Sequence, residues 1–140
     1  RSGWLPGGVA LAISIAAIAF IPMNAPAAEA GTSAPEGLVA ERFTPERLAE
    51  LRAARTPVFL YMTADWCLTC KVNEKGAMAD ARVAEAFKAK GVVVLEGDWT
   101  RGDPVISDWL SAEKRAGVPV YVFYGADGGK QDLPQLLSVD

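Results

Sequence analysis

Residues 58–71 read VFLYMTADWCLTCK, an apolar run that ends in the pair Cys67 and Cys70. The run from 58 to 62 is apolar on both faces, which predicts a buried central strand, and a helix-compatible segment follows the cysteines. A helix N-terminus carries partial positive charge, so it stabilises a thiolate and lowers the pKa of the first cysteine. Because the thiolate is the species that attacks disulfides, the stretch predicts a redox-active dithiol at a strand-to-helix turn.

Three other roles compete for the two cysteines. A zinc site of the usual Cys/His kind needs further ligands, and the chain has no histidine and no third cysteine, which excludes such a site within it. A purely structural disulfide would close so short a loop that it removes little entropy from the unfolded chain. Free cysteines are often inert and buried, but Trp66 before the pair and Lys71 after it favour a partly exposed, electropositive setting.

The composition fits one domain with an appendage. The 140 residues leave room for a domain of about a hundred residues, and 51% of them are hydrophobic, enough to bury a core. The formal net charge is −3, with acidic and basic residues intermixed, whereas a nucleic-acid partner would require clustered Lys and Arg. The sequence begins with Arg1 rather than methionine, and we expect a fragment or a processed product.

The N-terminal segment, residues 1–28, is predicted to be a transmembrane helix. Residues 2–28 contain no charge, and the apolar centre runs from 9 to 21. Residues 4–23 are about long enough to span a bilayer as a helix, and Trp4 fits an interfacial anchor. Arg1 would stay inside and the rest would be exported, which in a bacterium places the domain in the periplasm, where disulfides form.

Two alternatives remain for this segment. As a signal peptide it would have a short apolar core, with residues 25–27 or 28–30 resembling a small-residue cleavage site. As a buried helix of the domain it would need more protein around it than a chain end provides. Residues 29–43 are rich in Ala, Gly, Ser, Pro and Glu, which predicts a linker before a domain over residues 44–140.

Beyond the linker the sequence predicts an α/β layer fold closed by an antiparallel hairpin. Helix starts are indicated by Thr44-Pro45, Asp80 and Asp103-Pro104, and Gly91 is placed to end a helix in the left-handed conformation. The expected helices cover residues 44–54, 67–76, 80–91 and 103–117, and the expected strands cover 57–63, 92–95, 118–124 and 131–137.

A dithiol after a buried strand, together with the later Val118-Pro119 step, resembles the thioredoxin fold, in which that proline is cis and faces the dithiol. The runs TADWCLTCK at 63–71 and GDWT at 97–100 are more narrowly similar to the C-terminal periplasmic domain of the DsbD transmembrane thiol:disulfide reductases, including Scs-type members. The resemblance covers about residues 58–137. It implies that the apolar N-terminus is the last membrane helix of such a protein.

The resemblance implies a protein-disulfide reductase that acts as one stage of an electron relay in the bacterial inner membrane. A cysteine pair of the membrane domain would donate electrons to this dithiol, which would then reduce a periplasmic disulfide. No organic cofactor or metal is needed. Two alternatives stay open: a membrane-tethered thioredoxin that serves cytochrome c maturation, and a Cu(I)-binding module, since a dithiol can hold Cu(I).

Each candidate site residue has an expected role. Cys67 is the nucleophile and Cys70 resolves the mixed disulfide, while Trp66, Val118 and Pro119 contact the partner.

Thioredoxins usually carry a buried carboxylate six positions before the first cysteine, where this chain has Tyr61. Glu74, on the same helix face as the cysteines, is therefore the candidate proton acceptor, or else a solvated charge that pairs with Lys71 or Lys75. Tyr61, Trp99 and Trp109 are expected in the core. The family also has a final helix, so residues 138–140 read as the start of a truncated one.

Overall fold

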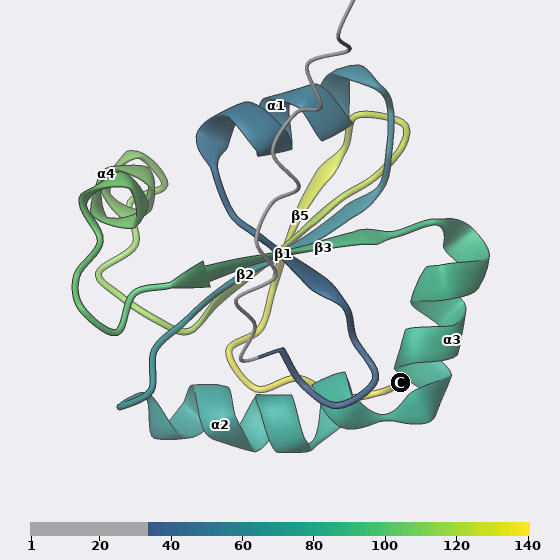
Figure 1. Ribbon diagram of the computed structural model, residues 1–140, viewed down its shortest axis with the longest axis horizontal. Helices are drawn as coiled ribbons and strands as arrows, with labels where there is room; N and C mark the ends of the chain where they lie inside the picture. The colour runs from purple at the N-terminus through teal and green to yellow at the C-terminus, as the bar shows by residue number, and fades with distance from the viewer. Residues whose placement is uncertain (1–33) are drawn as a thin grey trace, which may run out of the picture.

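The computed structural model describes residues 34–140, which form a five-stranded sheet with helices on both faces (Figure 1). The predicted membrane helix and its signal-peptide alternative lie outside the described residues. Within residues 34–140, no helix combines the length and the hydrophobicity that crossing a membrane requires.

The sheet is mixed, with strand order β1-β3-β2-β4-β5. The parallel part is β1, β3 and β2, while β4 and β5 run antiparallel and close the sheet as the predicted hairpin. The elements in chain order are β1 (Ala40–Arg42), α1 (Pro45–Ala53), β2 (Val58–Thr63), α2 (Leu68–Lys75), the 3₁₀ turn η1 (Ala77–Ala79), α3 (Ala81–Lys90), β3 (Val93–Asp98), α4 (Pro104–Ala112), β4 (Val120–Tyr124) and β5 (Lys130–Leu133).

The predicted helix boundaries at α1 and α3 are confirmed by their caps. The Thr44 hydroxyl accepts a hydrogen bond from the Arg47 N–H at 3.0 Å, and the Asp80 carboxylate accepts one from the Arg82 N–H at 2.8 Å. Such bonds satisfy N–H groups that have no partner inside the helix. Gly91 ends α3 with φ of +65°, a conformation that glycine adopts without steric cost.

The predicted linker is wrong at its C-terminal end. Residues 40–42 form β1, which pairs with β3, and Leu38, Ala40 and Phe43 are buried. Small and polar residues dominate the composition of 29–37, so the whole segment was predicted as a linker. The short alternation of buried and more exposed positions at 38–43, which is typical of a strand, was missed.

Two other elements end earlier than the sequence predicted. Helix α4 stops at Ala112, because Lys114 takes a positive φ of 55° and the Arg115 N–H turns back to the Leu110 carbonyl at 2.8 Å. Strand β5 stops at Leu133, since the next residue is Pro134, which has no N–H to donate to the sheet.

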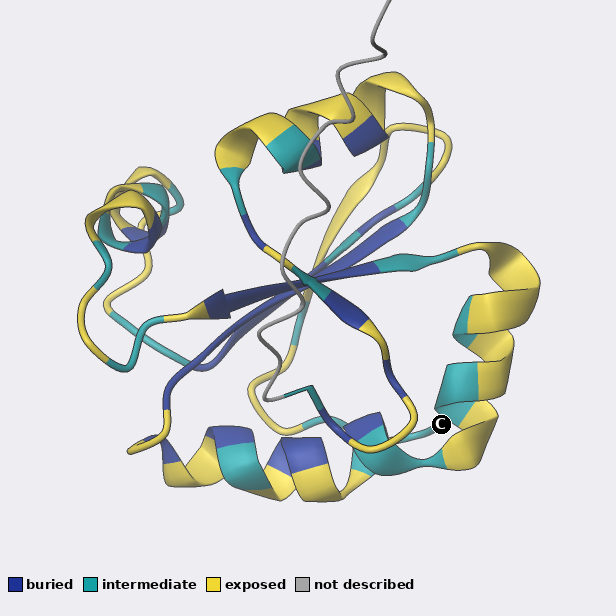
Figure 2. Ribbon diagram, in the orientation of Figure 1, coloured by how far each residue is buried: buried dark blue, intermediate teal, exposed yellow. Residues whose placement is uncertain are grey.

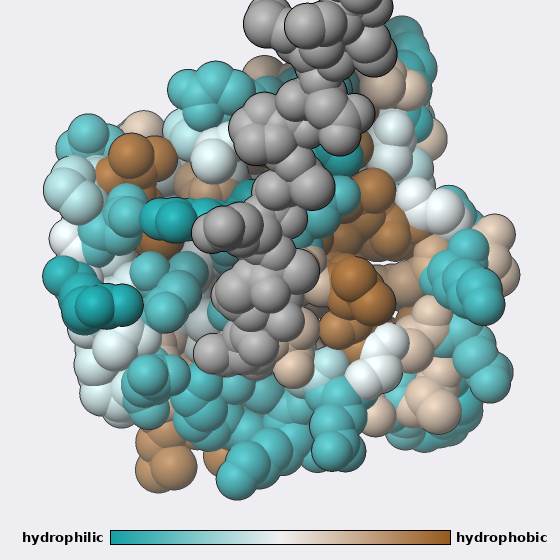
Figure 3. Space-filling model, in the orientation of Figure 1, coloured by the Kyte–Doolittle hydropathy of each residue, from teal (hydrophilic) through white to brown (hydrophobic). Residues whose placement is uncertain are grey.

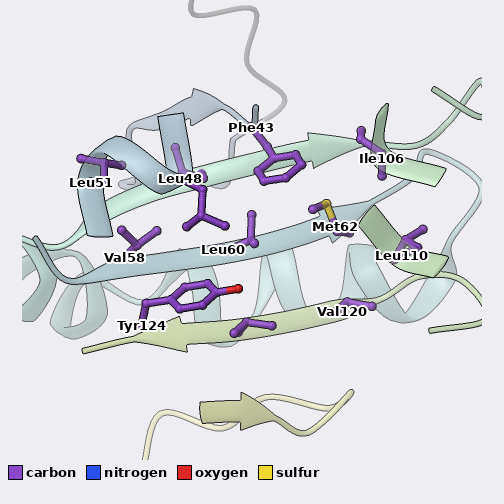
Figure 4. Close-up of a cluster of buried hydrophobic side chains, with 12 residues drawn as sticks. Phe43, Leu48, Leu51, Val58, Leu60, Met62, Ile106, Leu110, Val120 and Tyr124 are labelled. Carbon is purple, nitrogen blue, oxygen red and sulfur yellow. The ribbon is translucent and has the colours of Figure 1, made fainter. Parts of the chain in front are cut away.

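The central strands β2, β3 and β4 are mostly buried (Figure 2), and the cores on the two faces of the sheet differ in chemistry. Beneath α1 and α4 the core is apolar, with Leu60 and Met62 of β2 among side chains from both helices (Figure 4). Beneath α2 and α3, aromatic side chains such as Phe59 and Tyr61 are buried together with polar groups. Side chains alternate along a strand, so β2 supplies both cores.

Candidate active site

The two cysteines form a disulfide at the start of α2, with their Cα atoms 5.3 Å apart. Cys67 is the N-cap of this helix, and its sulfur accepts a hydrogen bond from the Cys70 N–H at 3.3 Å. Cys70 is fully buried, whereas 7% of Cys67 is exposed. Cys67 is therefore the more accessible sulfur, although it is less exposed than the partly exposed setting that the sequence predicted.

The cap position gives Cys67 a specific chemical advantage. In the reduced protein a thiolate there would lie at the positive end of the α2 dipole and next to a backbone N–H donor. Both interactions favour the charged sulfur over the neutral thiol. Cys70 lies within the first turn of the helix and is shielded from solvent, where burial disfavours a charge.

The Val118–Pro119 peptide bond is cis, as the resemblance predicted. Val118 packs against the small buried cluster of Ala64, Cys67 and Cys70, so the loop before β4 lies beside the dithiol. An open pocket of about 480 Å³ adjoins this loop and is lined in part by Val118 and Pro119. The structure thus brings together residues that are about fifty positions apart in the sequence.

Trp66 lies beside the dithiol and is 61% exposed. Its indole N–H donates to the Thr100 carbonyl at 3.1 Å, and its ring centroid is 6.1 Å from that of Trp99. Trp99 packs against the apolar core, as predicted, and also supports Trp66. Leu68 and Val72 on α2 are exposed as well, and Figure 3 shows hydrophobic surface at its lower left, beside the start of α2.

Glu74 is buried, with 8% of its surface exposed. Its carboxylate accepts a hydrogen bond from the Thr63 hydroxyl and another from the Lys71 ammonium, the latter at 2.8 Å. The predicted pairing with Lys71 is present, but the carboxylate is not a solvated surface charge. Glu74 belongs to α2, the helix that begins at the cysteines, and its carboxylate faces Thr63 at the end of β2.

A second buried carboxylate, Glu96 on β3, was not expected from the sequence. It lies in register with Tyr61 on β2, and the Tyr61 hydroxyl donates to it at 2.8 Å. Burial raises the pKa of Glu96, and the negative charge of Glu74 adds to the shift, while the Tyr61 hydrogen bond opposes it. Tyr61 is fully buried, and its pKa is raised by burial and by the Glu96 charge.

One signal could have revealed Glu96. It follows the apolar run 92–95, where a strand was predicted, and a charged residue that continues a buried strand is unusual. The prediction ended the strand at Leu95, whereas β3 continues to Asp98. Asn73 was also missed: it donates to the Tyr121 hydroxyl at 2.8 Å and to the Gln135 carbonyl at 2.7 Å.

The fold and the dithiol agree with comparisons to known proteins. A model of the thioredoxin-like family matches residues 39–126, which is more than half of the sequence. The chain belongs to the thioredoxin-like family. This match confirms the predicted thioredoxin-like fold and extends over the cysteine pair and the cis proline loop.

The curated relatives include proteins named thiol:disulfide interchange protein DsbD. The one from Vibrio vulnificus strain CMCP6 is 36% identical over 83 residues, which is 59% of this chain and 14% of that protein. The one from Escherichia coli K12 is 33% identical over 87 residues, covering 62% of this chain and 15% of that protein. The match therefore covers about one seventh of the length of these relatives.

Solved structures support the fold. The oxidised C-terminal domain of DsbD from Neisseria meningitidis superposes with a TM-score of 0.56 and 22% identity, covering 70% of this chain and 88% of that domain. Its reduced form gives a TM-score of 0.54 and 21% identity, covering 69% of this chain and 88% of that domain. The chain is thus a thioredoxin-like domain that is homologous to thiol:disulfide interchange proteins and carries the Cys67–Cys70 pair.

Proposed function

We propose that this chain is the periplasmic stage of a transmembrane electron relay, in which the dithiol of Cys67 and Cys70 reduces a partner disulfide. The observation that carries the proposal is the position of Cys67 as N-cap of α2, where a thiolate is stabilised and remains the more accessible sulfur. The relatives are named thiol:disulfide interchange proteins, which supports the same chemistry.

The membrane part of the proposal rests on the sequence. Residues 4–23 are apolar and uncharged, long enough to cross a bilayer, and the domain follows them in the chain. A donor dithiol in a membrane domain and an acceptor disulfide in the periplasm would then meet the same cysteine pair in turn. No metal or organic cofactor takes part in these steps.

The exchange balances through two sulfur substitutions. The Cys67 thiolate attacks one sulfur of the partner disulfide, forms a mixed disulfide and releases the other partner sulfur as a thiolate. Cys70 then loses its proton and attacks the Cys67 sulfur, which forms the Cys67–Cys70 disulfide and releases the second partner thiolate. The two released thiolates take up protons. A donor dithiol reverses the sequence and restores the reduced pair.

The surroundings of the dithiol fit a protein partner. Trp66 projects into solvent beside Cys67, and Val118 with Pro119 forms the other side of the site. A partner must bring a sulfur to Cys67, so its chain would contact Trp66 on one side and the pocket at Pro119 on the other. Exposed apolar side chains at that position favour a partner with apolar residues next to its cysteine.

The test is a matched pair of serine variants. With insulin as the disulfide substrate, Cys70→Ser is expected to accumulate a stable mixed disulfide through Cys67, because nothing resolves it. Cys67→Ser is expected to form none, because Cys70 is buried. Non-reducing electrophoresis and mass spectrometry give the yields. Equal trapping by both variants would reverse the assignment of roles, and tight Cu(I) binding without exchange would favour a copper module.

A further inference from the structure

Two carboxylates are buried between α2 and the sheet, and they differ in their partners. Glu74 accepts hydrogen bonds from the Lys71 ammonium and the Thr63 hydroxyl. Glu96 accepts one from the neutral Tyr61 hydroxyl and forms no ion pair within residues 34–140. The disulfide exchange steps do not require Glu96, and burying an ionised carboxylate without a charged partner costs free energy.

The position of Glu96 connects it to the dithiol. Its hydrogen-bond partner Tyr61 lies on β2, the strand that leads through Thr63 into the cysteine turn. The negative charge of Glu74, one turn after Cys70, acts on both Tyr61 and Glu96. Electrostatic interactions weaken slowly with distance in a poorly solvated interior, so a charge at Cys67 or Cys70 is expected to reach Glu96 as well.

The charges around Glu96 act in opposite directions: the Glu74 and Asp98 charges raise its pKa, and the Lys71 charge lowers it by less. Arg42 on β1 is its neighbour in register, but the Arg42 guanidinium pairs with Asp103 at 3.6 Å and is mostly exposed. The titratable and charged groups that surround Glu96 are Tyr61 on β2, Glu74 and Lys71 on α2, Arg42 on β1 and Asp98 on its own strand.

We propose that Glu96 is a positioning residue for the dithiol, which holds a proton while Cys67 is a thiolate and releases it when the disulfide forms. The coupling is thermodynamic, since a nearby thiolate favours the protonated carboxyl and an ionised carboxyl disfavours the thiolate. The partner dithiol that reduces the pair supplies two electrons and two protons. One of these protons stays on the Cys70 sulfur. The second is taken up by the Glu96 carboxylate instead of the Cys67 sulfur.

The inference rests on the proposed exchange function, but its test needs no partner. In the whole chain, the carbon-13 carboxyl signals of glutamate are titrated by NMR in the disulfide form and after reduction with dithiothreitol. The Glu96 signal is assigned by its loss in Glu96→Gln and its shift in Tyr61→Phe. Glu96 is expected to titrate at higher pH in the reduced protein. Identical titrations in the two redox states would overturn the proposal.

A second readout follows the thiolate itself. Alkylation of the reduced chain by iodoacetamide, measured against pH, is expected to be roughly two- to tenfold faster in Glu96→Gln at a pH below the thiol titration. Tyr61→Phe is expected to raise the pH at which Glu96 titrates, because it removes the hydrogen bond to the carboxylate. Glu85→Gln, an exposed site on α3, should follow the wild-type curve, and a Glu96→Gln curve that also does so would contradict the proposal.

The two proposals fail in different ways. If Glu96 titrates differently in the two redox states but the chain reduces no protein disulfide, the Glu96 coupling is supported and the relay function is refuted. If the chain reduces insulin but Glu96 titrates identically in both states, the relay function is supported and the Glu96 coupling is refuted.

Discussion

The two cores on either side of the sheet share the same strands but bury different kinds of side chain. Beneath α1 and α4 the buried side chains are apolar, apart from the hydroxyl of Tyr124. On the other face, Thr63 and Glu96 of the sheet are buried together with Asn73 and Glu74 of α2. In residues 34–140 every buried side-chain nitrogen and oxygen has a hydrogen-bond partner. The apolar core thus provides stability, while the polar core places charge next to the dithiol without leaving a polar group unpaired.

The largest effect on stability is expected in the apolar core. Leu60 is fully buried on β2, and Leu60→Ala should lower the free energy of unfolding by about 2–5 kcal/mol, because it removes apolar contacts and leaves a cavity. Urea denaturation followed by tryptophan fluorescence measures it. Leu68→Ala is the matched control, since Leu68 is 79% exposed and its loss should cost less than about 0.5 kcal/mol. Equal costs would contradict the contrast in burial.

In the polar core, Glu74→Gln is expected to change both stability and reactivity. Loss of the charged contact to the partly exposed Lys71 should cost about 1–2 kcal/mol. A carboxylate near a thiol raises the thiol pKa, so its removal should shift the pH–rate profile of disulfide exchange to lower pH. Glu85→Gln on α3 provides the control. Superimposable wild-type and Glu74→Gln profiles between about pH 5 and 9 would leave Glu74 with a structural role only.

A smaller effect concerns the pH dependence of stability. Burial raises the pKa of Glu96 in the folded chain above its ordinary value of 4.5, so the folded state favours the protonated form. The stability that this preference provides is present below the ordinary pKa and is lost as pH rises through the folded pKa. Relative to Glu96→Gln, the wild type should therefore lose stability over that window. Urea unfolding at a series of pH values tests this, and parallel curves would refute it.

Only a small effect on stability is expected from Trp66, at the exposed edge of the site. Trp66→Ala should change the free energy of unfolding by less than about 1 kcal/mol, because most of the ring is exposed. It should nevertheless slow the reduction of insulin while leaving the reduction of oxidised glutathione nearly unchanged, since only the larger substrate reaches Trp66. Equal slowing of both reactions would assign Trp66 a role in the chemistry rather than in docking.

The sequence predicted the fold well where its signals are local. The caps at Thr44 and Asp80, the glycine at 91 and the apolar run before the cysteines each act over a few residues. The cis Val118–Pro119 bond came from the resemblance. The strand β1 was missed because it is three residues long and derives its stability from pairing with β3, which is a long-range contact.

The site was predicted in part for the same reason. The cysteines, Trp66 and Glu74 lie in one continuous stretch, so their proximity follows from helical spacing. Glu96 reaches the site only through the register between β2 and β3, and no local pattern encodes that register. The burial of Glu74 also depends on Thr63 at the end of β2, which a helix considered alone does not show.

The strand β1 also determines where this domain can safely be cut. With the order β1-β3-β2-β4-β5, β1 covers one edge of the sheet. A truncation at residue 44, the boundary that the helix start suggests, would remove β1 and leave the outer edge of β3 without its partner at residues 94–96. Such an edge is a template for another extended chain. Shortened forms that keep Leu38 and β1 should stay monomeric, and those that begin at Thr44 should aggregate.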